Sequence, residues 1–252
     1  MVGLSFLLLS VYTVASGIVG VKLLQRARTS RGVPELLIGL AYVAAPATGY
    51  PLCILAPLIP SRAIAAPLYV LGETLLVSGC CSYLFFTAKV FRPREGWATG
   101  CAAVGSAILV AAGVQITGAY FVSADAAENV ARARPGLTAM VGILALYYAW
   151  TAFEGFRYHA MMKKRMALGL ADPVVTNRFL LWAFAGLVSL AWISVSAVCL
   201  AAGIDLRSTL PLLCTSTGGF ANTLLLVLIF MPPAAYTRWV TRGTRAGALA
   251  PA

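Results

Sequence analysis

Residues Ala63 to Phe91 read AIAAPLYVLGETLLVSGCCSYLFFTAKVF, an apolar run long enough to cross the hydrocarbon core of a membrane as one helix. The run carries one acid near its middle, Glu73, and one lysine near its end, Lys89. Similar runs occur along the rest of the chain. The sequence therefore predicts seven transmembrane helices, at about 4–24, 35–58, 63–91, 97–121, 137–157, 179–202 and 209–231.

The composition favours a membrane protein over a soluble one. Of the 252 residues, 60% are hydrophobic and only 11% are charged, whereas a soluble domain is about one quarter charged. The same figures exclude disordered, collagen-like and disulfide-stapled secreted proteins. We predict an all-α integral membrane protein with a single bundle of seven transmembrane helices over residues 1–235 and a basic, flexible cytoplasmic tail over 236–252.

The positive charge is sorted by side. Nineteen Lys and Arg against eight Asp and Glu give a formal charge of +11. Successive spans alternate in direction, so every second loop and the C-terminal tail lie on one side of the membrane. All but four of the basic residues lie on that side; the exceptions are Arg62, Arg132, Arg134 and Arg207. Because basic residues resist translocation, we predict an outer N-terminus and a cytoplasmic C-terminus in the cell (inner) membrane. The charge thus reports orientation, and no nucleic-acid partner is predicted.

Two proline patterns predict local structure. Pro46 and Pro51 lie inside the second expected helix, where a missing N–H kinks the backbone. Asp172 followed by Pro173 is typical of a helix N-cap and first turn. The sixth helix should therefore begin inside the cytosol, before Arg178.

Glu73 is the one ionisable residue expected near the middle of the membrane. At 1.5 Å per residue it lies about 15 Å deep, and no lysine or arginine is expected at that level. An intramembrane carboxyl is either a neutral hydrogen-bonding group between helices or part of a functional site facing a wet cavity. We treat it as a candidate for ligand binding, and both interpretations stay open.

A second polar cluster lies in the seventh expected helix. Thr215 and Asn222 flank two glycines there, a pattern typical of close packing or of an unwound binding turn. Three aromatic residues are expected at similar depth and are further candidate ligand contacts: Tyr50, Tyr147 and Trp192. Ordinary packing is the commoner role of such residues in a membrane bundle, and it stays open here.

A basic stretch with Lys163, Lys164 and Arg165 follows the fifth expected helix and extends it into the cytosol. Such stretches lie on anionic lipid headgroups or bind a cytosolic protein partner. The two interpretations are not separated by the sequence.

The sequence completes no catalytic or cofactor motif. The four lysines lie at helix ends, so a retinal Schiff base within the bundle is not predicted. A single histidine, His159, cannot build a zinc centre of several ligands. We therefore predict no metal, no cofactor and no catalytic residue, and favour a protein that is not an enzyme.

Three functional hypotheses remain. The first is a sensor or receptor-like protein that binds a small, fairly apolar ligand within the bundle and signals to a cytosolic partner. The second is a proton-coupled secondary transporter of a small solute, with Glu73 as the protonatable site. The third, with weaker support, is a lipid-modifying enzyme or a subunit of a membrane complex.

Overall fold

The computed structural model describes residues 2–120, 122–123 and 126–248, and all regular structure in these ranges is helical. The elements are α1 (Val2–Ser30), α2 (Val33–Ala44), the π-helix η1 (Ala45–Gly49), α3 (Tyr50–Leu55), the 3₁₀-helix η2 (Ala56–Leu58), α4 (Arg62–Phe91), α5 (Gly96–Tyr120), α6 (Ala126–Ala167), α7 (Pro173–Ala201), α8 (Thr209–Phe230) and α9 (Ala234–Ala248).

Seven of these helical segments are long and apolar enough to span a membrane, as the sequence predicts. The second segment combines α2, η1, α3 and η2, over Val33–Leu58. Two helices are longer than their expected apolar spans: α6 reaches beyond 137–157 at both ends, and α7 begins before residue 179, as the Asp172–Pro173 pattern predicts. Hydropathy marks only the apolar part of a helix, whereas these helices continue into polar turns. Phe121 and residues 249–252, expected in the fourth span and the tail, lie outside the described residues.

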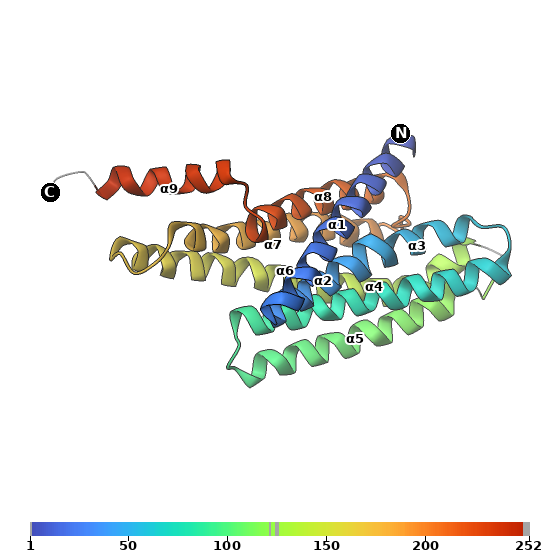
Figure 1. Cartoon of the computed structure of the whole chain (residues 1–252). Coiled ribbons are helices and arrows are strands. Elements are labelled where there is room, and N and C mark those ends of the chain that lie inside the picture. Colours follow the sequence, from blue (N-terminus) through green and yellow to red (C-terminus); the bar gives the residue numbers. More distant parts are fainter. Residues whose placement is uncertain (1, 121, 124–125, 249–252) are drawn as a thin grey trace.

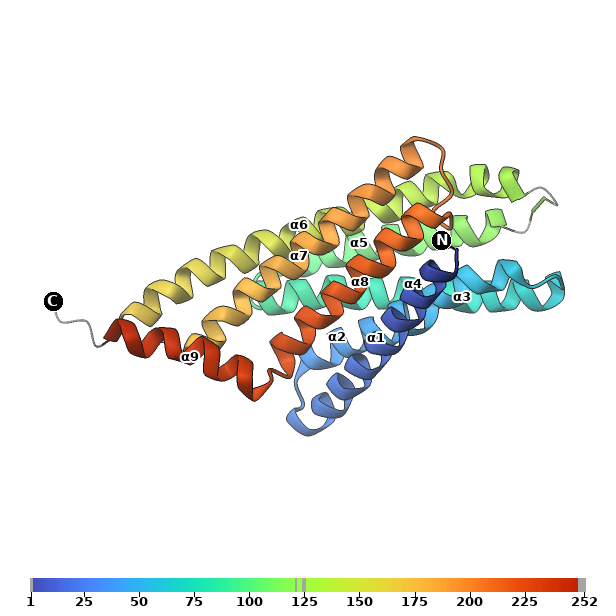
Figure 2. The same ribbon diagram turned by 90° about the horizontal axis from the view of Figure 1, so that it is seen from above.

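The seven spans form a closed ring. Consecutive spans pack against each other from α1 through α8, and α1 also packs against α8, which closes the ring (Figures 1 and 2). The loops consequently gather at two ends. We call one the α9 end, formed by α9 and the loops at 31–32, 92–95 and 168–172. The opposite, N-terminal end contains the loops at 59–61 and 202–208.

The second span is irregular where the prolines predict a kink. Pro46 lies in the π-helix η1, and Pro51 lies in the first turn of α3. The hydroxyl of Thr48 donates a 2.8 Å hydrogen bond to the carbonyl oxygen of Val43, which partly compensates the disturbed backbone ladder. The expected distortion is confirmed, and its form is a single π-turn.

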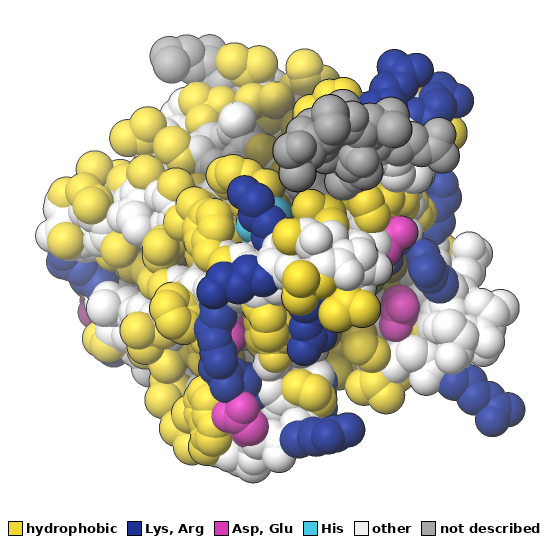
Figure 3. Space-filling model, turned by 90° about the vertical axis from the view of Figure 1, so that its left-hand side faces the viewer, with side chains coloured by type: hydrophobic (Ala, Val, Ile, Leu, Met, Phe, Trp, Pro, Cys, Tyr) yellow, Lys and Arg dark blue, Asp and Glu magenta, His cyan; other side chains and the backbone are white. Residues whose placement is uncertain are grey.

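The basic residues concentrate at the α9 end, where Lys and Arg side chains surround the helix ends (Figure 3). The expected tail contains the amphipathic helix α9 instead of a flexible segment. This helix packs against α7, and Asn177 of α7 donates a hydrogen bond to the hydroxyl of Tyr236. Its Trp239 side chain is 70% exposed.

Capping at the start of α7 follows the sequence pattern. The Asp172 side chain accepts hydrogen bonds from the backbone N–H groups of Val174 at 2.7 Å and Val175 at 3.0 Å, and Pro173 occupies the first helical position. These contacts satisfy two of the N–H groups that a helix start leaves free. The predicted start of this helix at Asp172 and Pro173 is therefore confirmed, whereas its cytosolic location stays a prediction.

Candidate functional site

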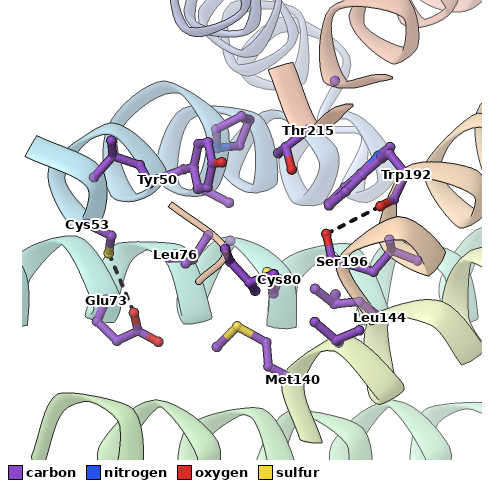
Figure 4. Close-up of a pocket in the computed structure, with 18 of the residues that line it drawn as sticks. Tyr50, Cys53, Glu73, Leu76, Cys80, Met140, Leu144, Trp192, Ser196 and Thr215 are labelled. Carbon is purple, nitrogen blue, oxygen red and sulfur yellow. Dashed lines mark hydrogen bonds between the residues drawn. The ribbon is translucent and has the colours of Figure 1, made fainter. Parts of the chain in front are cut away.

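A cavity of about 210 Å³ lies inside the ring and is lined by residues of all seven spans. Its walls are mainly aromatic and aliphatic, and the α7–α8 loop contributes Leu206 and Arg207. Figure 4 shows residues of five helices around this space: Tyr50 of α3, Glu73 of α4, Met140 of α6, Trp192 of α7 and Thr215 of α8. Pockets for drug-sized ligands measure about 300–1,000 Å³, so this cavity suits a smaller molecule.

Glu73 brings a carboxyl group into this largely apolar space. The side chain is buried, with 4% of the residue exposed. The Cys53 thiol donates to Oε2 across 3.5 Å (Figure 4), whereas Oε1 is buried without a hydrogen-bond partner. Among the described residues, Glu73 forms no ion pair with a lysine or arginine. Buried polar atoms are almost always paired, so an unpartnered carboxyl oxygen in a cavity points to a ligand contact.

Two glycines allow the neighbouring helices to approach Glu73. A Cβ on Gly72 would lie 2.7 Å from the Cβ of Leu52, so α3 packs directly against the α4 backbone at this level. A Cβ on Gly113 of α5 would lie 3.6 Å from Oε1 of Glu73. The carboxyl group is consequently held between α3 and α5.

Aromatic rings and an arginine form the cavity wall nearest to the N-terminal end. The ring centroids of Tyr69 and Tyr120 are 4.6 Å apart, and Arg207 Cζ lies 4.6 Å from the Tyr120 centroid. Arg207 also forms a 3.0 Å ion pair with Asp205. Burial disfavours the charged form of Arg207, but Tyr120 and the Asp205 carboxylate more than offset this and raise its pKa above the ordinary value. We call Tyr69, Tyr120 and Arg207 the Arg207 layer.

A second group of polar atoms comes from α7 and α8. The side-chain amide of Asn222 donates to Ser189 Oγ over 2.9 Å, and its Oδ1 is buried without a partner. The indole N–H of Trp192 is likewise buried and unpartnered. Trp192 packs onto Gly218, where a Cβ would lie 2.6 Å from the indole Cδ1. The cavity therefore offers unpartnered acceptors on both α4 and α8.

Towards the α9 end, the space inside the ring is filled by aromatic packing. Tyr83 lines the cavity, and its ring centroid lies 5.4 Å from that of Tyr148 and 6.4 Å from that of Phe86. Phe86 packs against Trp182 at 4.9 Å, and Trp182 against Phe230 at 5.8 Å. These large side chains separate the cavity from the α9 end.

The candidate ligand residues fall into two groups. Five of them line the same cavity: Glu73, Asn222, Tyr50, Trp192 and Thr215. Tyr147 does not: its ring lies 5.4 Å from that of Trp150 and close to Gly105 of α5. Consecutive helical residues point about 100° apart, and it is the next residue, Tyr148, that lines the cavity.

The sequence did not single out Cys53, Tyr69, Tyr120 or Arg207 as candidate ligand contacts, although all four line the cavity. For Tyr69 a signal existed, because it lies four residues before Glu73 and therefore on the same helix face. No comparable signal exists for Arg207, because it lies in the α7–α8 loop and not on a helix face. Its position depends on how the α7–α8 loop folds back over the ring.

The remaining candidates, Lys163, Lys164 and Arg165, are exposed near the end of α6 and far along the chain from the cavity-lining part of that helix. Within the described ranges, no three His, Cys, Asp or Glu side chains group in a way that could hold a metal ion.

Comparison of the chain with protein-family models, with curated proteins and with solved structures gives no match. The function must therefore be inferred from the geometry of the cavity. A small cavity, apolar walls and a few unpartnered acceptors are properties of a binding site.

Proposed function

We propose that this chain is a receptor-like multi-pass membrane protein that binds a small, largely apolar molecule in the cavity and signals to a cytosolic partner. The observation that carries this proposal is the buried, unpartnered Oε1 of Glu73 in a cavity lined by all seven spans. Asn222 Oδ1 supplies a second polar anchor. Aromatic and aliphatic walls supply the apolar contact.

The outer surface supports insertion into a membrane. Along α1, the side chains of Leu4, Leu7, Val14 and Ile18 are all more than half exposed. Such a continuous apolar surface is unfavourable in water and favourable in lipid. The basic α9 end supports a cytoplasmic C-terminus in a cell (inner) membrane, because basic segments remain on the cytoplasmic side.

Aromatic packing below the cavity favours binding over passage. A transported solute would have to pass Tyr83, Phe86 and Trp182 to reach the α9 end. The ring of Phe86 packs against the rings of both Tyr83 and Trp182. The ring is therefore filled between the cavity and the α9 end. A receptor needs only that the ligand changes the packing of the helices that touch it.

A chain of contacts links the cavity to the α9 end. The hydroxyl of Tyr83 is 3.0 Å from that of Thr151 on α6. One turn further along α6, the buried Glu154 forms a 2.7 Å ion pair with Arg92 at the end of α4. A ligand that displaces Tyr83 would thus alter how α4 and α6 pack where they emerge from the bundle.

The basic end of α6 is the proposed contact for the partner. Lys163, Lys164 and Arg165 are exposed on a helix that extends past the apolar span. Anionic headgroups are the alternative contact for these cations, and each contributes about 1 kcal/mol near a charged membrane. α9 packs against α7 at the same end of the bundle and has the basic, amphipathic character of a helix at the lipid surface.

A proton-coupled transporter is the second candidate, and Glu73 is the observation that favours it. A carboxyl group without a basic partner, buried within the spans, has the chemistry of a protonatable coupling site. The two functions differ in whether a bound molecule crosses the bilayer.

Three probes of similar size test the proposed function: 2-phenylethanol, 2-phenylethylammonium and phenylacetate. Calorimetric titration of the purified full chain should show saturable binding of at least one probe. Leu144→Trp, which places a larger side chain in the cavity wall, should weaken that binding at least tenfold. The matched change Leu146→Trp, on the same helix at a residue that is 67% exposed, should leave the binding as in wild type.

Binding of none of the probes, or equal binding by wild type and Leu144→Trp, contradicts a ligand site in this cavity. Reconstituted vesicles separate the two candidate functions. Under a pH gradient, vesicles that contain a receptor accumulate the bound probe no more than protein-free vesicles do. If wild-type vesicles accumulate the probe and Glu73→Gln abolishes this accumulation, the protein is a transporter and the receptor proposal is wrong.

A further inference from the structure

We propose that the cavity recognises a small organic cation, an aromatic or alkyl amine whose ammonium group pairs with Glu73. This inference rests on the proposed ligand-binding function and specifies the class of ligand. Four features of the cavity lead to it: its unpartnered acceptors, its charge, its aromatic walls and its size.

Among the unpartnered atoms of the lining, the indole N–H of Trp192 is a donor, whereas the two oxygens favour a ligand that donates hydrogen bonds. Glu73 Oε1 and Asn222 Oδ1 are both acceptor atoms, since the amide nitrogen of Asn222 already donates to Ser189. An ammonium group carries up to three N–H donors and no acceptor. A carboxylate ligand has no N–H or O–H to offer and would place its oxygens against those of the protein.

The charge in the cavity is also suited to a cation. Glu73 and Arg207 are the lining residues of the described chain with a side chain that is ordinarily charged at neutral pH. Arg207 is already paired with Asp205 and lies over the ring of Tyr120. Glu73 has no such counter-charge, so an anionic ligand would be repelled by it, whereas a cationic ligand supplies the missing partner.

Because Asp205 holds Arg207, the arginine does not offer a free site for a ligand carboxylate. The guanidinium makes contacts to both carboxylate oxygens of Asp205, at 3.2 and 3.0 Å. An amine without a carboxylate therefore matches the cavity better than an amino acid.

Aromatic side chains form much of the cavity wall. Eight of them line the cavity: Tyr12, Tyr42, Tyr50, Tyr69, Tyr83, Tyr120, Tyr148 and Trp192. The face of an aromatic ring is electron-rich and attracts ammonium groups, most strongly where water is excluded. The same rings pack well against the apolar part of an amine, and the volume of about 210 Å³ limits that part to a small group.

The test compares 2-phenylethylammonium with 2-phenylethanol, its neutral counterpart of nearly the same shape, and with phenylacetate, at pH 7. The wild-type chain should bind the cation at least tenfold more tightly than the alcohol and should bind the anion most weakly. A charge-assisted hydrogen bond exceeds a neutral one by about this factor. Glu73→Gln should remove the preference for the cation, and Glu73→Asp, which keeps the charge, should retain part of it.

Glu128→Gln is the matched control, because it removes an exposed carboxylate paired with Arg132 outside the cavity. It should bind all three probes as the wild type does. Equal affinity for the cation and the alcohol, a preference for phenylacetate, or a cation preference that survives in Glu73→Gln overturns the inference. If 2-phenylethanol binds in a manner sensitive to Leu144→Trp but the cation has no advantage, the proposed function stands and only the amine inference fails.

Discussion

The contact between α4 and the π-helix η1 makes a sharp prediction for Gly79→Ala. A Cβ at this position would lie 2.6 Å from the backbone nitrogen of Ala45, 2.7 Å from its Cβ and 2.9 Å from the carbonyl oxygen of Ala41. Real Cβ atoms do not approach other atoms this closely. Because two of these neighbours are backbone atoms, no rotamer change relieves the overlap, and the two segments must separate.

The magnitude follows from two opposing effects. Overpacking of this kind costs about 1–3 kcal/mol. Alanine also recovers up to about 1 kcal/mol of helix propensity over glycine. Gly100→Ala on α5 isolates the second effect, because a Cβ there meets nothing within 4 Å. The difference between the two variants is therefore the cost of the close contact, about 1–3 kcal/mol in unfolding free energy.

Thermal unfolding of the purified variants in detergent, followed by tryptophan fluorescence, measures this difference. For a chain of this size, about 2–4 °C in Tm corresponds to 1 kcal/mol, so Gly79→Ala should unfold about 2–12 °C below Gly100→Ala. Equal unfolding temperatures, or a higher one for Gly79→Ala, would refute the close packing of α4 against η1.

Three further predictions concern the α9 end and the helix caps. Glu154→Gln should lower the unfolding free energy by about 1–3 kcal/mol, because Arg92 loses its charged hydrogen bond to the buried Glu154 and keeps only the one to Glu95; an unchanged denaturation midpoint would contradict this. Asp172→Ala should cost about 0.5–2 kcal/mol, and Ser208→Ala, at an N-cap without a side-chain bond, should cost less; equal thermal shifts would contradict the assigned caps. Hydrogen bonds from Arg92 hold the pKa of Glu95 below its ordinary value of 4.5, so the stability that Glu95 contributes should be present above that pH and lost as the pH falls through the lower folded value. As the pH is lowered below about 4.5, the unfolding temperature of Glu95→Gln should consequently decrease less than that of the wild type. An identical dependence of the unfolding temperature on pH would exclude this contribution.

The number of spans was predictable because each depends on composition over a long window. About 20 apolar residues define a span regardless of what the helix touches. The depth of Glu73 was equally accessible, since depth in a straight helix is the rise per residue multiplied by position. The same estimate placed Asn222 and Trp192 at similar levels, and the structure brings all three to one cavity.

The side of each helix that faces the cavity was not predictable in the same way. Tyr147 and Tyr148 have almost the same depth, but only Tyr148 faces the cavity. Spans in lipid have apolar residues on both the inner and the outer side, so hydrophobic periodicity does not mark the inward face. Long-range pairs are hidden for a related reason. Glu154 and Arg157 are three residues apart on one helix and do pair, but the shorter contact of Glu154 is to Arg92 on another helix.

The prolines of the second span predict that this helix is distorted, but they do not predict which of its residues face the cavity. Tyr42, Pro46, Tyr50 and Ile54 follow at intervals of four residues, and all four line the cavity. In a straight α-helix each such step turns by about 40°, so the last of these residues would point about 120° away from the first. The wider turn of η1 absorbs much of this rotation and keeps both halves of the span directed at the same space. The prolines predict that the helix is distorted; the direction of the distortion, and with it the placement of Tyr50 beside the cavity, depends on packing against the glycines of α4.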